Sequence, residues 1–389
     1  MGFGIDRRAR SRKGRGLFRK APDPREVGDR FGRLARRMFK LALTKAGWGK
    51  DRYLAELVLF PGAPAVTFTI GSDAELALTG DAAPLGPAFI AELVDKVAPI
   101  LDELDFVWTE PFDLGQTQAA MCSWLAGELR GTEQVRIGAP RTRRFRIDAP
   151  LLSPLGPRDA AWRDAVLADP SRAADVFPWW ERGPGRLERA RALIAMWSEV
   201  AWREPLDADE RELLKTVDED LRAARKADEA LALPWPDWKE LLAHLGIEDE
   251  DVSEKAGAAT STIGYRRHDL DVELSGGWHV RLPGAMVGRW EEDGGRYWAT
   301  DGDRAIEFTS FTVDGERDSG KLLAVAAEAH PVVDRFADAA AHGRAEAFTD
   351  EDIPVVVGLV AAAPHVGILT VKGGDQAWAL ATWRSLEQR

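Results

Sequence analysis

Residues 353–371 read IPVVVGLVAAAPHVGILTV, the longest uncharged run of the chain. Its nineteen residues approach the length of a membrane span, but two prolines and two glycines interrupt it, and valine is frequent. These breakers favour two buried strands joined at Ala363-Pro364-His365 over a single apolar helix. We therefore expect the end of the chain to form a sheet.

The sequence around that run alternates with a period of two, which is typical of strands. Val272, Leu274, Val280 and Leu282 predict a hairpin around Gly276-Gly277. Residues 264–389 are predicted to form a mostly antiparallel sheet domain with one long helix. The helix is expected at Lys321–Ala341, and further strands are expected at Ala345–Phe348 and Ala377–Trp383.

Two motifs in this region carry a family resemblance. They are GWHVRLP at Gly277–Pro283 and AIEFTS at Ala305–Ser310, followed by the predicted long helix and more strands. In this pattern, residues 264–389 resemble the Mog1/PsbP/DcrB-like superfamily. The resemblance implies a binding or accessory module, such as a secretion-system chaperone, more than an enzyme. Residues 1–250 resemble no family in this way.

The middle of the chain is predicted to be helical. Residues 158–247 form a helical segment that we expect to pack on the N-terminal domain, and residues 248–263 are predicted to be a linker because they are acidic and then small or polar. Asp207 and Glu210 form a helix-capping pattern. The segment holds seven of the fifteen tryptophans. Their spacing favours a packed core over a ligand platform.

Residues 23–157 are predicted to be an α+β domain. A helix is expected from Pro24 to Lys45, with an apolar stripe that packs on the domain's own core. Tyr53–Phe60 and Ala65–Ile70 predict a hairpin. A second helix is expected to begin at Gly86-Pro87. The whole chain is therefore assigned to the α+β class.

The net charge of −12 hides an asymmetry. Residues 1–50 hold 16 Lys/Arg against 4 Asp/Glu, which leaves 36 against 60 in the rest. An acidic body repels nucleic acid and anionic membranes, whereas a basic segment attracts them. Residues 1–22 are predicted to be a disordered basic arm. Its candidate contacts for an anionic partner are Arg7, Arg8, Arg10, Arg12, Lys13 and Arg15.

No catalytic, cofactor-binding or metal-binding residues are assigned from the sequence. The single cysteine, Cys122, excludes an internal disulfide and is expected to be a buried structural thiol. The six histidines lie at least eleven positions apart, which excludes a pair spaced by one helical turn. His330, His342 and His365 fall in the C-terminal domain with Asp301, Asp303 and Glu307, but the aspartates are better explained by turn chemistry.

The leading hypothesis is a non-enzymatic, cytoplasmic binding or accessory protein of a bacterial system, with another protein as its partner. The beginning, MGFGIDRRAR, has no apolar core of a secretion signal. The first alternative is an enzyme with a site between the N- and C-terminal domains. The second is a nucleic-acid or membrane-surface adaptor that uses the basic arm. No cofactor is predicted, and the oligomeric state is left open.

Overall fold

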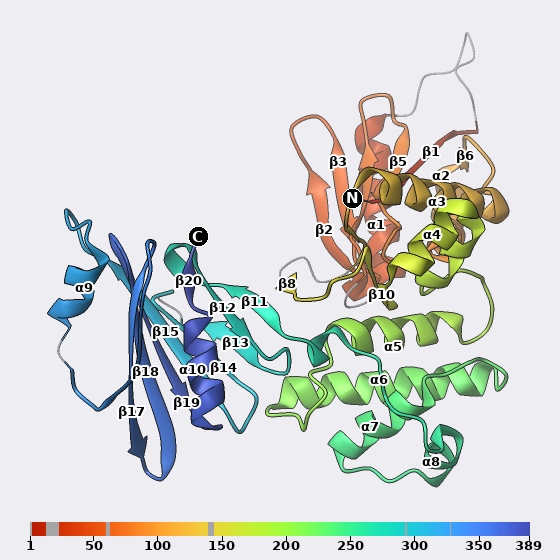
Figure 1. The fold of residues 1–389 in the computed structure, drawn as a ribbon. Helices are drawn as coiled ribbons and strands as arrows, with labels where there is room; N and C mark the ends of the chain where they lie inside the picture. Colours follow the sequence, from red (N-terminus) through yellow and green to blue (C-terminus); the bar gives the residue numbers. More distant parts are fainter. Residues whose placement is uncertain (1, 13–22, 60–62, 139–143, 292–293, 327) are drawn as a thin grey trace. The chain divides into compact units, whose positions relative to one another are not determined.

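The computed structural model describes residues 2–12, 23–59, 63–138, 144–291, 294–326 and 328–389 (Figure 1). The chain divides into two compact units. The first comprises Met1–Ala139, Asp148–Ser198 and Thr216–Pro234, and the second comprises Pro140–Ile147, Glu199–Lys215 and Trp235–Arg389. Both units combine helices with antiparallel sheets, which confirms the α+β class. No described helix is long and apolar enough to cross a membrane.

A six-stranded antiparallel sheet organises the first unit, in the order β2-β3-β4-β5-β1-β6. Its strands are β1 (Gly4–Ser11), β2 (Leu43–Trp48), β3 (Tyr53–Leu57), β4 (Val66–Ile70), β5 (Leu76–Asp81) and β6 (Phe106–Trp108). The predicted hairpin at 53–70 is confirmed as β3 and β4. Alternate side chains of these two strands are buried because only one face of the sheet meets the core.

Helices α1 (Pro24–Phe39) and α2 (Pro87–Leu104) cover that buried face. Val27, Phe31 and Leu34 of the predicted stripe are packed there, with Phe31 5.2 Å from Phe68 between ring centroids, whereas Met38 is 38% exposed. This confirms that the helix is docked on its own unit. It ends at Phe39 instead of Lys45, because the following residues are drawn into β2, which pairs with β3.

The predicted disorder of the basic arm is wrong for residues 4–11. They form β1, which pairs with β5 on one side and β6 on the other. Ile5 and Ala9 are buried in the core, so the strand supplies two apolar contacts in spite of its arginines. The pairing partners come from 65 or more positions further along the chain, and the local composition gives no sign of them.

The remainder of the first unit surrounds α3 (Leu114–Gly131), whose apolar side packs against α4 (Ala160–Ala168) and η2 (Pro170–Val176). Three short strands lie beside these helices: β7 (Val135–Arg136), β9 (Leu151–Ser153) and β10 (Gly156–Arg158). Helix α5 (Arg186–Ser198) and the second half of α6 (Ala208–Ala227) complete the unit.

A seven-stranded antiparallel sheet forms most of the second unit, in the order β13-β14-β15-β19-β18-β17-β16. Its strands are β13 (Val287–Trp290), β14 (Arg296–Thr300), β15 (Ala305–Thr312), β16 (Val332–Ala337), β17 (His342–Asp350), β18 (Ile353–Ala362) and β19 (His365–Lys372). The uncharged run at 353–371 is therefore a strand pair, as predicted. A smaller sheet contains β8 (Arg144–Phe145), β11 (Leu270–Glu273), β12 (Trp278–Leu282) and β20 (Glu387–Gln388).

Two predicted elements of this unit are wrong. The long helix expected at 321–341 is replaced by the short helix α9 (Ser319–Val325) and by β16. Pro331 cannot continue a helix, and Val332 and Val333 favour a strand. The strand expected at 377–383 is helix α10 (Gln376–Arg384), whose first turn is capped by Asp375 accepting from Trp378 N at 2.7 Å.

Helices α9 and α10 lie on opposite sides of the seven-stranded sheet (Figure 1). Trp383 of α10 packs in the main core together with Trp278 and Phe308. On the other side, Leu322 of α9 packs against Ala361 and Val366. We call this second side the outer face; it leaves part of the sheet without a covering helix.

The predicted linker at 248–263 is a folded segment. Residues 250–256 form α8 (Glu250–Ala256), which packs on α7 (Trp235–Leu245) and buries Val252. Asp237 of α7 is buried, and its Oδ1 accepts from Ser261 Oγ at 2.5 Å, Thr262 N at 2.8 Å and Ile263 N at 2.7 Å. The predicted helical segment 158–247 is correspondingly divided between the two units.

The Asp237 contacts predict resistance to proteolysis where a linker would be cut. Residues 250–263 should be spared in the native chain. Asp237→Ala should open them to cleavage and lower the free energy of unfolding by about 2 kcal/mol, because hydrogen bonds to a charged group are lost. Glu254→Ala, at an exposed position of α8, is the control and should change neither the cleavage nor the free energy of unfolding. Early cleavage of the native chain within 250–263 would contradict this prediction.

Candidate functional site

Two of the predicted anion contacts are engaged inside the first unit. The Arg7 guanidinium lies 5.8 Å from the ring centroids of both Trp108 and Phe112 and donates to the Glu110 carbonyl. Arg12 Nη2 forms an ion pair with Asp102 Oδ1 at 2.6 Å. Both side chains therefore hold β1 in place and are not presented as an arm.

The other four positions differ. Arg8 lies 3.6 Å from carboxylate oxygens of Asp6 and of Glu75, and Arg10 is exposed. Lys13 and Arg15 lie outside the described residues. Contact between these four residues and an anionic partner stays a prediction. Arg8 and Arg10 belong to strand β1 of the sheet.

Cys122 is a buried residue of α3, and its Sγ lies 3.9 Å from the Ser171 carbonyl. Burial raises the pKa of the thiol, and the nearby Asp169 carboxylate adds to the rise. A raised pKa leaves less of the reactive thiolate at neutral pH. The arrangement is that of a structural thiol, as predicted.

The three histidines of the C-terminal sheet come from different segments and make different contacts. His330 stacks on Phe348 with ring centroids 3.9 Å apart, and His365 Nδ1 lies 3.1 Å from Thr312 Oγ1. His342 lies at the start of β17. Within the described ranges, no three His, Cys, Asp or Glu side chains are placed to hold a metal ion.

One pocket lies on the outer face of the second unit, and we call it the C-terminal groove. It has a volume of about 670 Å³ and lies between α9 and the strands β16 and β17. Its walls combine apolar residues of α9, such as Leu323 and Ala324, with the polar groups of Glu328, Arg335 and His342. The size is within the range of ligand-binding clefts.

A buried ion pair lies at the C-terminal groove, and one of its members, Arg344, lines the groove. Arg344 and Glu346, two residues apart on β17, are each 3% exposed, and Arg344 Nη2 lies 2.9 Å from Glu346 Oε1. Arg344 also donates to the Ala326 carbonyl at 3.0 Å. Glu346 Oε2 accepts from Ala329 N and His330 N, each at 2.9 Å. The pair therefore fixes the segment that joins α9 to β16.

Exposed apolar side chains occur on the segments that supply the groove's walls, and we call these side chains its apolar rim. Val325, between the lining residues Ala324 and Ala326, is 85% exposed, and Val333 of β16 is 39% exposed. In the described part of the chain, β16 pairs with β17 alone, so it is the outer strand of the sheet. Along β16, Val333, Arg335 and Ala337 are all exposed, and the register with β17 shifts between Val332 and Asp334.

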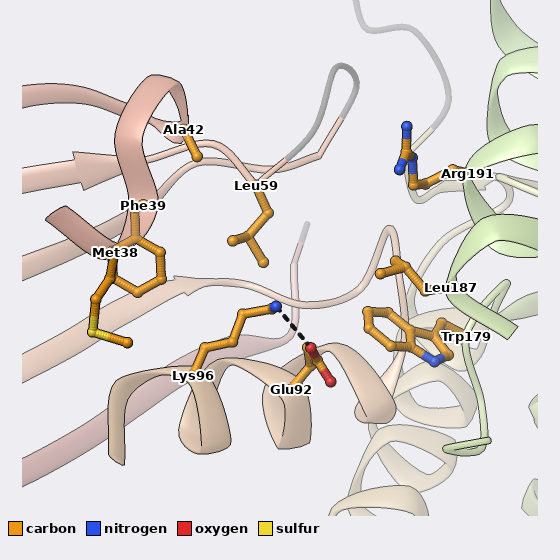
Figure 2. Close-up of a pocket in the computed structure, with 9 residues that line it drawn as sticks. All are labelled: Met38, Phe39, Ala42, Leu59, Glu92, Lys96, Trp179, Leu187 and Arg191. Carbon is orange, nitrogen blue, oxygen red and sulfur yellow. Dashed lines mark ion pairs between the residues drawn. The ribbon is translucent and has the colours of Figure 1, made fainter. Parts of the chain in front are cut away.

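A second hollow lies within the first unit, and we call it the N-terminal pocket (Figure 2). It has a volume of about 310 Å³. Its walls come from the end of α1, from α2, from α5 and from the segments after β3 and η2. They consist of Met38, Phe39, Ala42, Leu59, Glu92, Lys96, Trp179, Leu187 and Arg191.

Charged groups from α2 and α5 line this pocket. Lys96 Nζ lies 3.1 Å from Glu92 Oε1, one turn apart on α2, and Arg191 Nε lies 3.3 Å from Asp220 Oδ2. Burial raises the pKa of Asp220 to about 6. Arg191 opposes the rise, whereas the carboxylates of Glu188 and Glu219 add to it.

The raised pKa of Asp220 makes stability depend on pH. The pKa of Asp220 is higher in the folded chain than in the unfolded chain, so binding of its proton favours folding. This stabilisation is complete below the unfolded pKa of about 3.9 and is lost as pH rises through the folded pKa of about 6. Asp220→Asn should therefore raise the free energy of unfolding by about 2 kcal/mol at pH 7.5. Below pH 4 the difference should vanish.

Urea titrations of both proteins between pH 4 and pH 7.5 check this prediction. Asp209→Asn, at an exposed position of the same helix, is the control and should show no comparable trend. A variant that is less stable than the native chain at pH 7.5 would mean that the attraction to Arg191 outweighs the cost of burial.

Sequence reasoning missed both hollows. The pattern GRAEA at 343–347 places opposite charges two residues apart within an apolar strand, which is the signal of a buried pair on one face. Comparison of the chain with protein-family models and with curated proteins found no match.

Proposed function

We propose that this chain is a non-enzymatic binding protein that takes up an extended segment of a partner protein along β16. The observation that carries the proposal is the exposed outer strand beside the C-terminal groove. An outer strand presents backbone donors and acceptors that another strand can satisfy. The side chains of the added strand then have the groove and its apolar rim within reach.

The exposed side chains of β16 define the chemistry of the partner. Val333 and Ala337 offer apolar contacts on either side of Arg335, so cross-strand pairing favours apolar residues opposite them. Arg335 forms an ion pair with Glu328, and these two side chains are 55% and 51% exposed. An exposed pair of this kind contributes little, so Arg335 is able to turn to an acidic residue of the partner.

The proposal agrees with what the resemblance of the C-terminal third implies, namely a binding module more than an enzyme. The resemblance stays a prediction, and the long helix included in it is not found at the described residues of 321–341. A bacterial source and a cytoplasmic location belong to the same proposal. The enzyme alternative stays a prediction, and the adaptor alternative is weakened by the ordered β1.

Random short peptides selected on the full chain test the proposal. The selected sequences should alternate apolar residues around an acidic one. Val333→Asp and Arg335→Glu should each weaken binding by about tenfold or more, which corresponds to 1.4 kcal/mol. A peptide with lysine in place of its acidic residue should recover affinity for Arg335→Glu.

Lys372→Glu provides a matched control, since it reverses an exposed charge at the end of β19 in the same sheet. It should leave peptide binding unchanged. Selected peptides that lack the alternation, or that bind both β16 variants as tightly as the native chain, would refute the proposed site.

A further inference from the structure

We propose that the N-terminal pocket binds a small monocarboxylate with an apolar body. The inference concerns the first unit and does not depend on the peptide site of the second. It rests on the size of the pocket, on its apolar walls and on the partly exposed Lys96 among the residues that line it.

The size of the pocket limits the ligand. A volume of about 310 Å³ corresponds to the space of about ten water molecules. It is at the lower end of the range of small-molecule sites. The pocket therefore fits a short chain or a single ring, and not a nucleotide or a long lipid.

The walls of the pocket favour an apolar ligand body. Phe39, Leu59, Trp179 and Leu187 contribute side chains from four separate segments. Figure 2 shows Phe39 on one side and Trp179 on the other, with Leu59 between them. Trp179 is 4% exposed, so it is fixed in the core and offers a rigid wall. Each methylene that leaves water here should strengthen binding about three- to fourfold.

Lys96 offers a cation to an anionic head group. Two cations, Lys96 and Arg191, line the pocket with one carboxylate, Glu92. Arg191 is paired with Asp220 at 3.3 Å and is 31% exposed, so Lys96 is the more accessible of the two cations. In Figure 2 the Lys96 side chain reaches between Phe39 and Trp179, and Arg191 lies on the side formed by α5. Glu92 and Lys96 are 25% and 45% exposed, so solvent screens their attraction and the pair is weak. A ligand carboxylate can therefore compete for Lys96.

Calorimetric titration of the full chain with butanoate, hexanoate and octanoate tests the inference. Affinity should rise about three- to fourfold per methylene until the pocket is filled. Hexylamine and hexanol, which have the same apolar body, should bind at least about tenfold more weakly than hexanoate. An amine that binds as tightly as hexanoate would overturn the assignment of an anionic ligand.

Variants of the lining residues locate the binding. Lys96→Met should weaken hexanoate binding about tenfold, and Glu92→Gln should strengthen it because a competing carboxylate is removed. Leu187→Trp should abolish binding by filling the pocket, with circular dichroism to confirm folding. Lys239→Met, at an exposed position of α7, is the control and should have no effect.

Unchanged affinity in both Lys96→Met and Leu187→Trp would place any carboxylate binding elsewhere and overturn the proposal. Peptide binding to β16 should be unaffected by all of these variants, so failure of one proposal is distinguishable from failure of the other.

Discussion

Replacement of Glu346 by alanine is expected to lower the free energy of unfolding by about 3–5 kcal/mol. The reason is that the Arg344 guanidinium stays buried after its nearest carboxylate has gone, since both side chains are 3% exposed. The Glu328 carboxylate, 3.8 Å from Arg344 Nη1, is 51% exposed, so solvent screens its attraction. Two backbone N–H groups, those of Ala329 and His330, lose their acceptor at the same time. The wall of the C-terminal groove between α9 and β16 should become mobile.

A double variant separates the cost of burying the Arg344 charge without Glu346 from the net contribution of the pair. Arg344→Met combined with Glu346→Leu should recover a large part of the stability lost in Glu346→Ala, because no charge is left buried. Asp350→Ala, at an exposed position of β17, should stay within about 0.5 kcal/mol of the native chain. Urea unfolding measures all three. A loss of less than about 1 kcal/mol in Glu346→Ala would show that water reaches the pair.

A loss of similar size, about 3–4 kcal/mol, is expected for Arg266→Met. Arg266 is 5% exposed, and its guanidinium donates to the carbonyls of Glu199 at 3.1 Å, Gly284 at 2.8 Å and Met286 at 3.0 Å. The methionine fills similar space but leaves three carbonyl groups short of a donor. These three carbonyls belong to two segments of the second unit that are far apart in sequence.

The control for Arg266 is Arg281→Met, which removes an exposed arginine from β12 and should cost less than about 0.5 kcal/mol. Arg266→Lys should behave like the methionine variant, since a single ammonium cannot replace the fork of donors that Arg266 directs at separate carbonyls. Equal stability of Arg266→Lys and the native chain would contradict the role assigned to the guanidinium geometry.

The elements that the sequence predicted well are those defined by local patterns. Helix α2 begins at Pro87, and its apolar period continues to Leu104. The uncharged run at 353–371 predicts the β18–β19 pair that forms from the same residues. In both cases the signal and the structure occupy the same residues.

The elements that it missed depend on partners that are distant in sequence. Strand β1 is rich in arginine, and only its pairing with β5 and β6 reveals it as part of the sheet. A helix was expected through 341, whereas β16 is stabilised by its pairing with β17 and by Phe336, whose ring centroid lies 5.4 Å from that of Trp383. Tertiary contacts override local propensity in each case.

The candidate sites could not be predicted for the same reason. The C-terminal groove exists because α9 and the β16–β17 hairpin meet on one face, and the N-terminal pocket brings together residues from positions 38 to 191. The basic residues that did attract attention, Arg7 and Arg12, serve the fold of the first unit. Net charge predicts which kind of partner a segment attracts, but it does not predict whether the segment pairs as a strand in a sheet.

If β16 receives an extended peptide, hydrogen exchange of the full chain, measured with and without a peptide selected on it, should detect the added strand. We predict slower exchange at residues 332–337 when the peptide is bound, because its backbone would protect the outer edge of β16. Exchange at residues 287–290, in the strand β13 at the opposite edge, should not change. Unchanged exchange in β16, with protection elsewhere, would contradict the claim.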